Sequence, residues 1–475
     1  MIKYFFSALF IFSFVVSGYS QETKYKPDWR SLDSRPIPGW FQEAKFGIFI
    51  HWGVYSVPAW RKVVPGRYAS YAEWYYARVM FDTVQGGADF HNKNYGKDFE
   101  YRDFGPLFKA ELWNPDYWAE LFKRSGAKYV VLTSKHHDGY CLWPTNSPYK
   151  KDWNSNDVGP KRDLVGELTT AVRNKGLKMG LYYSIIEWET NKTHRTNTGY
   201  FIPEYLVEKY SIPKEDYIDK HMIPQLKELV EKYEPSLIFS DAGEWDKSSE
   251  EWKTIDFLSW LYNEAPNKEE VVVNDRFGKD MPGKHGDYFS SEYEDAEGMG
   301  SSHPWEESRG MGVSYGYNRA EDIEIYNSSK QLIHELIEIV SRGGNLLLNV
   351  GPTADGRIPV IMQERLLDIG EWLDLNGEAI YGTHPRGPSS ENQQQNIYFT
   401  QKDGNIFVLC TEWPGNNLEI TGISDSVEDI NLIGYEKNID WKVMNGKVSI
   451  TPPLVSPGTF KGKYAYVFQI KLNVK

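Results

Sequence analysis

The sequence is poor in cysteine. Its 475 residues include only Cys141 and Cys410, which stand far apart in the chain. Two such cysteines exclude the disulfide framework of a small secreted protein. We expect both to be small buried residues in separate domains rather than partners in a bridge. With 40% hydrophobic and 15% aromatic residues, the composition is that of a globular protein and excludes disorder over most of the length.

Runs of basic residues are also lacking. The chain has 53 Lys and Arg residues against 66 Asp and Glu residues, for a formal net charge of −13. Because a phosphate backbone is bound by clustered positive charge, we expect no nucleic-acid partner. Neutral substrates suit an acidic protein better, although a local basic pocket could still hold a sulfated or carboxylated substrate.

Long hydrophobic runs are confined to the N-terminus. Lys3 precedes an apolar run over residues 4–16, and the small residues Gly18 and Ser20 stand where a signal peptidase cleaves. We predict a signal peptide over residues 1–20 and a protein that is secreted or periplasmic after its removal. A membrane anchor is the alternative, but the run is too short to cross a bilayer comfortably. No later stretch approaches the length of a membrane span.

Between residues 46 and 351, short β-rich runs alternate with amphipathic helical segments. Strand candidates begin at residues 46, 129, 178, 236, 270, 287 and 344, and helical spacing covers residues 115–126, 162–176 and 223–235. This alternation is typical of β-α units around a parallel sheet. An eighth strand would fit in the poorly patterned region 54–111. No glycine-rich phosphate loop follows the first strand, which favours a (β/α)8-like TIM barrel over an open doubly wound sheet.

From about residue 396 the pattern changes. Apolar and polar residues alternate in short runs separated by Gly, Asn and Pro, which indicates an antiparallel β-domain. The boundary is expected near residues 383–395. We therefore divide the mature chain into a barrel domain over residues 21–385 and a C-terminal β-domain over residues 390–475.

Polar residues gather at the carboxyl ends of the predicted strands, where a barrel would bring them to one rim and where barrel active sites are built. They are His51, His136, His137, Tyr182, Tyr183, Asp241, Asn274, Asp275, Arg276 and Glu292.

Two carboxylates from different strands suit glycoside hydrolysis. One attacks or stabilises the anomeric carbon, and the other, kept protonated by burial, donates to the departing oxygen. Asp241 and Glu292 are the candidates, and Glu244, Glu294 and Glu297 compete for the second role. A helix-capping Asp and a solvated acidic loop are the alternatives to a catalytic pair.

The histidines raise the alternative of a metal site. Adjacent residues on a strand point to opposite faces, so His136 and His137 are awkward co-ligands, and no His-x-His or His-x-x-x-His pair occurs. We predict no metal and no cofactor, and expect these side chains to bind hydroxyls or to be core histidines. Among the many tryptophans, Trp52 and Trp74 adjoin ionisable residues and are candidates to cover the apolar face of a sugar.

Eight segments carry a resemblance to a known family. They are FGIFIHWGVYSVPAW, YAEWY, LTSKHHDGYCLWPT, GLYYS, FSDAGEW, VNDRFG, PWEESRGMGVSYGYN and SRGGNLLLNVGPTADG. In their fixed order, from about residue 29 to 381, they resemble the α-L-fucosidases of glycoside hydrolase family 29. The resemblance implies a (β/α)8-like barrel with a C-terminal β-sandwich. It also implies a retaining, exo-acting hydrolase that releases terminal α-L-fucose from fucosylated oligosaccharides or glycoconjugates without a cofactor.

The resemblance also implies roles for single residues. Asp241 would be the nucleophile and Glu292 the acid/base. A retaining mechanism then requires their carboxyl groups to lie about 5 Å apart. No motif specifies the linkage, the aglycone or the oligomeric state, and a metal-dependent barrel hydrolase and an inactive sugar-binding barrel are the rival hypotheses. The implied sugar-binding residues are His51, Glu73, Trp74, His136, His137, Tyr183, Arg276 and Tyr315.

Overall fold

The computed structural model describes residues 25–66, 68–191, 202–293, 299, 302–386, 396–423, 427–456 and 460–473. The predicted signal peptide lies outside these residues. Within them, no helix combines the length and the apolar character that crossing a membrane requires.

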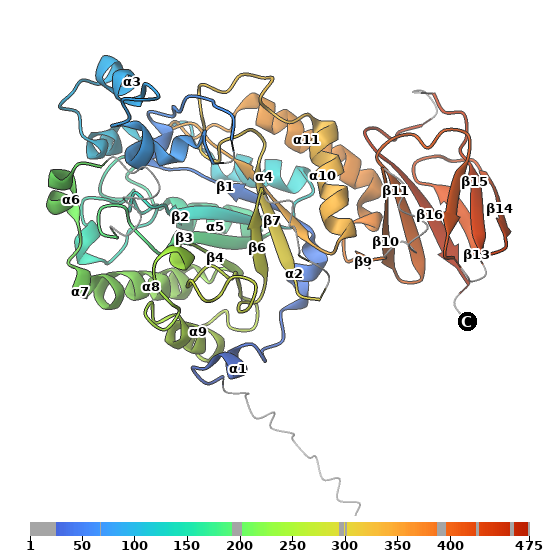
Figure 1. Ribbon diagram of the computed structural model, residues 1–475, viewed down its shortest axis with the longest axis horizontal. Coiled ribbons are helices and arrows are strands. Elements are labelled where there is room, and N and C mark those ends of the chain that lie inside the picture. The colour runs from blue at the N-terminus through green and yellow to red at the C-terminus, as the bar shows by residue number, and fades with distance from the viewer. Residues whose placement is uncertain are drawn as a thin grey trace, which may run out of the picture.

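Eight parallel strands in the described residues form the barrel predicted from the sequence (Figure 1). Their order around the sheet is β5-β4-β3-β2-β1-β8-β7-β6, and the parallel bridge between Asn274 and Tyr288 joins the two end strands. The strands are β1 (Phe46–Ile50), β2 (Tyr129–Lys135), β3 (Lys178–Ser184), β4 (Leu237–Asp241), β5 (Val272–Val273), β6 (Phe289–Glu292), β7 (Trp305–Gly310) and β8 (Asn345–Val350).

Seven of these strands coincide with the predicted ones, but the position expected for the eighth is wrong. The eighth strand is β7, whose sequence WEESRG carries three charged residues. Glu306 and Glu307 are completely buried, which hides the strand from a search for apolar runs. The described part of region 54–111 forms helical turns instead: η1 (Val54–Ser56), η2 (Ala72–Trp74), η3 (Tyr75–Val79), α3 (Gly87–Asn94) and η4 (Tyr101–Leu107).

The three predicted helices are present as α4 (Pro115–Arg124), α5 (Leu164–Asn174) and α8 (Ile223–Tyr233). Side-chain caps explain where two of them begin: Asn114 accepts from the Tyr117 N–H, and Asp163 accepts from the Gly166 N–H. The remaining helical elements are α1 (Trp29–Leu32), α2 (Gly39–Ala44), η5 (Pro148–Lys150), α6 (Glu204–Tyr210), α7 (Lys214–Asp216), η7 (Tyr217–Met222), η8 (Gly243–Trp245), α9 (Thr254–Asn263), α10 (Ser329–Ser341), α11 (Val360–Asn376) and η9 (Gly377–Ala379).

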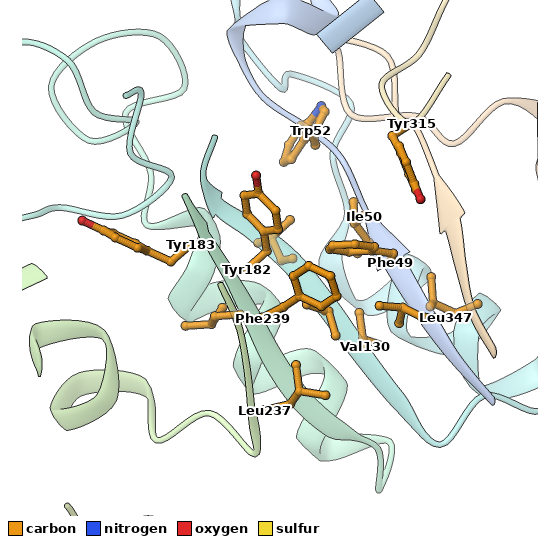
Figure 2. Packing of buried hydrophobic residues seen from close by; sticks show 14 of the residues in the cluster. Phe49, Ile50, Trp52, Val130, Tyr182, Tyr183, Leu237, Phe239, Tyr315 and Leu347 are labelled. Carbon is orange, nitrogen blue, oxygen red and sulfur yellow. The ribbon is translucent and has the colours of Figure 1, made fainter. Parts of the chain in front are cut away.

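Aromatic rings fill the barrel below its carboxyl-terminal rim. The ring of Phe49 on β1 lies 5.1 Å from that of Phe239 on β4 and 5.8 Å from that of Tyr182 on β3, as centroid distances (Figure 2). These side chains lie in the barrel interior and also line the cavity at its rim, in keeping with the packed interior of TIM barrels.

The C-terminal domain packs two antiparallel sheets face to face, as expected for a β-sandwich (Figure 1). The first has the order β13-β16-β11-β10-β9 and the second β12-β15-β14. Helices α10 and α11 lie between the barrel and this domain, and the Trp372 indole of α11 donates to the carbonyl of Ala465. The strands are β9 (His384–Pro385), β10 (Ile397–Lys402), β11 (Asn405–Cys410), β12 (Leu418–Thr421), β13 (Val427–Leu432), β14 (Asp440–Met444), β15 (Lys447–Thr451) and β16 (Tyr466–Leu472).

Two details bear on the sequence predictions. His384 and Pro385, assigned above to the barrel domain, pair with β10 and so belong to the sheet of the second domain. Cys141 and Cys410 are buried free thiols, as expected from their positions in separate domains.

Candidate active site

A cavity of about 360 Å³ opens at the carboxyl ends of the barrel strands. Of the ten residues to which the family resemblance assigns catalytic or sugar-binding roles, nine line it and Tyr183 does not. Asn274, one of the polar residues at the strand ends, is also absent from the lining. Its lining consists of Phe49, His51, Tyr68, Tyr71, Glu73, Trp74, Arg78, His136, His137, Tyr182, Phe239, Asp241, Glu244, Trp245, Asp275, Arg276, Pro282, Ser290, Glu292, Ser308 and Tyr315.

Asp241, the last residue of β4, is held as an ionised carboxylate. Its Oδ2 accepts a hydrogen bond from the Tyr182 hydroxyl at 2.6 Å and lies 3.5 Å from Nε2 of His137. Its Oδ1 accepts from the Ala242 N–H at 2.9 Å. Burial would raise the pKa of Asp241, but His137, Arg276 and these hydrogen bonds outweigh it and lower the pKa below its usual value.

The pKa of Glu292, the last residue of β6, is shifted in the opposite direction. Its Oε1 accepts from the Tyr71 hydroxyl at 2.8 Å, and its backbone carbonyl accepts from the Tyr68 hydroxyl at 2.9 Å. Burial raises the pKa of Glu292, and the negative charge of Asp241 acts in the same direction. Two neighbouring carboxyl groups whose pKa values are moved apart are suited to act as nucleophile and proton donor.

Arg276 joins the two carboxylates. Its Nη1 lies 3.4 Å from Oδ1 of Asp241 and 3.1 Å from Oε2 of Glu292. The two oxygens are therefore no farther apart than the sum of those distances, 6.5 Å. This upper limit on the distance between the two oxygens allows the carboxyl separation of about 5 Å found in retaining glycosidases. It equals the smallest separation found in inverting enzymes, where the range is about 6.5–9.5 Å.

The loop after β4 brings a third carboxyl group into the cavity. Ala242 adopts a left-handed conformation with φ of 62°. A Cβ on Gly243 would lie 2.5 Å from the backbone oxygen of Arg276, so only glycine allows this approach. Glu244 follows, and burial raises its pKa to about 8. Oε2 of Glu244 is buried and has no hydrogen-bond partner in the described residues.

Three histidines line the side of the cavity formed by β1 and β2. Burial lowers the pKa of His51 to about 4 and holds that of His136 well below its usual range, so both rings are neutral. Nδ1 of His51 lies 2.7 Å from Oδ1 of Asn349. Nδ1 of His136 is buried without a partner among the described residues. His137 contacts Asp241 directly.

Glu73, Trp74 and Tyr315 line the cavity from outside the regular β-α units. Oε2 of Glu73 accepts from the Gly316 N–H at 2.9 Å, and burial raises the pKa of Glu73 to about 7. The Trp74 ring packs against His137 with centroids 5.5 Å apart. The Tyr315 hydroxyl lies 2.8 Å from Oγ of Ser308, while its ring lies 4.7 Å from that of His51.

Tyr183 was predicted to bind the sugar, but its side chain does not line the cavity, whereas that of Tyr182 does. Side chains alternate along β3, and Tyr182, which pairs with Phe239, points into the barrel. Tyr183 points to the opposite side, where its hydroxyl donates to Oε1 of Gln225 on α8 (Figure 2).

Trp52 is likewise a core residue and not part of the cavity. Its indole donates to the Thr353 carbonyl, and its ring packs against Phe108, Trp113 and Trp118. Trp52 therefore lies outside the cavity although its neighbour in the sequence, His51, lines it.

Sequence reasoning missed Tyr68, Tyr71 and Arg78, which reach the cavity from the irregular region after β1. Tyr71 belongs to the segment YAEWY, which is one of the family motifs. The spacing of residues in that segment does not indicate that the Tyr71 hydroxyl contacts Glu292. Of the competing acids, Glu244 lines the cavity, whereas Glu294 and Glu297 lie outside the described residues. In the described part of the chain, no three His, Cys, Asp or Glu residues form a group that could hold a metal ion.

Comparison with known proteins extends over almost the whole chain. The family model described as alpha-L-fucosidase matches residues 13–378, and that described as alpha-L-fucosidase C-terminal domain matches residues 390–471. The tissue alpha-L-fucosidase of Bos taurus is 42% identical over 453 residues, covering 94% of this chain and 91% of that protein. The alpha-L-fucosidase of Dictyostelium discoideum is 38% identical over 477 residues, covering 97% of this chain and 98% of its own.

Solved structures show the same similarity. A crystal structure of Thermotoga maritima alpha-fucosidase in complex with a mechanism based inhibitor is 38% identical, with a TM-score of 0.79 over 94% of this chain and all of its own. Another, of the same protein in complex with fucose, is 37% identical with a TM-score of 0.77 and the same coverage.

Proposed function

The chain belongs to the α-L-fucosidase family, and from this membership and the geometry of its cavity we propose that it is an exo-acting, retaining α-L-fucosidase. The observation that carries the proposal is the contact of one guanidinium nitrogen of Arg276 with both Asp241 and Glu292. The substrate is a fucosylated oligosaccharide or glycoconjugate, and the reaction is hydrolysis of the terminal α-L-fucosyl bond.

In the first step, Asp241 attacks the anomeric carbon while Glu292 gives its proton to the departing glycosidic oxygen. The pKa directions support these roles, because the surroundings lower the pKa of Asp241 and raise that of Glu292. In the second step, Glu292 takes a proton from water, the water oxygen attacks the same carbon, and Asp241 leaves. Two displacements restore the α configuration.

The remaining lining supports fucose as the sugar. Fucose has three ring hydroxyls and a methyl group. The neutral His51 and His136 can exchange hydrogen bonds with hydroxyls, and Glu73 adds a carboxyl oxygen. Phe49, Phe239 and the ring of Tyr315 provide apolar surface for the methyl group. The packed barrel interior favours a terminal residue, since a sugar within a chain would need an exit at the far side.

The rival of an inactive sugar-binding barrel requires one carboxylate to be missing or turned away. Asp241 and Glu292 instead share Arg276 inside one cavity, which favours catalysis. We further propose that the barrel domain, residues 21–383 once His384 and Pro385 are counted with the second sheet, carries catalysis and that residues 390–475 form the accessory sandwich. The apolar N-terminal run leads us to propose a secreted or periplasmic enzyme.

The test is hydrolysis of 4-nitrophenyl α-L-fucoside by the purified protein, followed by proton NMR of the first sugar released. We expect α-L-fucose to appear before mutarotation produces the β anomer. A panel of linkage-defined fucosylated oligosaccharides then identifies the preferred linkage. Release of the β anomer first would contradict the assignment of Asp241 as a nucleophile, and inactivity on all fucosides would contradict the proposed function.

A further inference from the structure

A cluster of charged side chains is buried behind the cavity and takes no part in its lining. Oε1 of Glu187, in the loop after β3, lies 2.8 Å from Nζ of Lys135 and 2.8 Å from Nε2 of His221. Its Oε2 lies 2.5 Å from Nζ of Lys150. All four side chains are at most 2% exposed. Glu187 therefore ties its own loop to β2, η5 and η7 at once.

The charges of this cluster are fixed by their mutual contacts. Burial would raise the pKa of Glu187, but Lys135, Lys150 and His221 outweigh it and hold the pKa well below its usual range. Burial lowers the pKa of His221 to about 4, so this ring is neutral. It donates from Nε2 to Glu187 and accepts at Nδ1 from the Ser147 hydroxyl. A buried carboxylate with three donors has little freedom to move.

The neighbours of Glu187 in the chain hold His137 from two sides. The Trp188 N–H donates to the His137 carbonyl at 2.9 Å. The Ser184 hydroxyl lies 2.6 Å from the Ile186 carbonyl and 2.6 Å from Nδ1 of His137. A hydroxyl has one proton, and the carbonyl can only accept it, so Ser184 must accept from His137. Nδ1 of His137 therefore carries a proton. In the protonated ring Nε2 carries the second proton and faces Asp241, whose pKa the positive charge of His137 lowers.

We propose that Glu187 is a positioning residue that fixes the place and the orientation of His137, so that the positively charged imidazolium faces Asp241 and keeps it ionised. Lys135 stands two residues before His137, while Ile186 and Trp188 flank Glu187. The ion pair between Lys135 and Glu187 thus clamps together the two segments whose contact orients the imidazole. The inference rests on the proposed function, because it takes Asp241 to be the nucleophile.

The test compares Glu187→Gln with Asp287→Asn. Asp287 is also a buried carboxylate in an ion pair, 3.1 Å from Arg35, but it lies at the opposite end of the barrel, before β6. Both exchanges replace a carboxylate by an amide of the same shape, and both are expected to lower the melting temperature. The readout is the pH profile of kcat/KM on 4-nitrophenyl α-L-fucoside.

For Glu187→Gln we expect kcat/KM to fall by up to about 100-fold, the order of loss caused by a misplaced catalytic group. Without the charge of a well-placed His137, the pKa of Asp241 rises. The acid limb of the profile therefore moves up by about 1 pH unit. Asp287→Asn should leave that limb in place. The other titratable groups that act on Glu187 or Asp241 are unchanged in both variants: Asp138, Cys141, Tyr183, Tyr217, Tyr182, Glu244, Arg276 and Glu292.

Ser184→Ala is the second variant, and it decides the question if Glu187→Gln does not fold. It removes the hydroxyl between Ile186 and His137 without burying an unpaired charge, and should move the acid limb in the same direction. An active protein whose acid limb is unmoved in the folded variants overturns the role of Glu187. Wild-type protein that is inactive on fucosides would instead contradict the proposed function itself.

Discussion

Two tyrosine hydroxyls allow the roles of the two carboxylates to be tested separately. Tyr71 donates to Oε1 of Glu292 at 2.8 Å, and Tyr182 donates to Oδ2 of Asp241 at 2.6 Å. Tyr71→Phe and Tyr182→Phe each remove one oxygen atom from a buried ring and leave the packing in place. Each exchange therefore changes the hydrogen bonding of one carboxylate only.

The size of the effect follows from the strength of the bond removed. Each hydroxyl stabilises the ionised carboxylate, and a hydrogen bond to a charged group contributes about 1.5–3 kcal/mol. Because one pKa unit corresponds to about 1.4 kcal/mol, loss of the bond should raise the pKa of its partner by about 1 to 2 units. Glu292 must be protonated to act as the acid, so Tyr71→Phe moves the alkaline limb to higher pH. Asp241 must be ionised to attack, so Tyr182→Phe moves the acid limb to higher pH.

The assay is kcat/KM on an aryl fucoside from about pH 3 to 9, because this quantity reports the pKa values of the free enzyme. Tyr183→Phe is the matched control. Its hydroxyl contacts Gln225 outside the cavity, and both limbs should stay in place. If Tyr71→Phe moved the acid limb, or Tyr182→Phe the alkaline one, the assignment of acid and nucleophile would be reversed. If neither limb moved, the reasoning from these hydrogen bonds would be refuted.

Two further predictions concern buried carboxyl groups. Glu292→Ala should reduce hydrolysis of substrates with poor leaving groups by about 100-fold or more, with a smaller loss on activated aryl fucosides; equal losses on both would move the acid role to another residue, with Glu244 the candidate inside the cavity. Glu306 lies inside the barrel, where it accepts from Tyr129 and burial raises its pKa to about 8. The stability it contributes is complete below its usual pKa and is lost as the pH rises towards 8, by up to about 5 kcal/mol. Glu306→Gln should therefore flatten the dependence of the melting temperature on pH, and an unchanged dependence would show that this group does not titrate on unfolding.

Most of the elements predicted correctly from the sequence are those whose burial leaves an apolar pattern; β6, with the sequence FSSE, is an exception. Strands β1 to β4 and β8 have completely or largely buried apolar runs, and α4, α5 and α8 have amphipathic spacing. Strand β7 has no such run: its buried Glu306 accepts from Tyr129, and its buried Glu307 accepts from Arg309. Those partners are visible only once the barrel is closed.

The same distinction applies to the site. Asp241 and Glu292 could be predicted because each ends a recognisable strand at the rim where barrel sites are built. The choice between Tyr182 and Tyr183 depends on which face of β3 points inward. That is set by the pairing of Tyr182 with Phe239, a contact between distant segments. Tyr71 lies in an irregular segment in which hydrophobic residues recur with neither helical nor strand spacing. The sequence pattern therefore could not show that its hydroxyl reaches Glu292.

The most direct test of the central claim, that Asp241 is the nucleophile, is the product formed by Asp241→Ala in the presence of azide. We expect turnover of an aryl α-L-fucoside to fall by at least about 1000-fold in this variant. Azide should restore part of it by attacking from the side of the missing carboxylate, giving β-L-fucosyl azide. Hydrolysis at nearly the wild-type rate without azide, with α-L-fucose as the first product, would contradict the account.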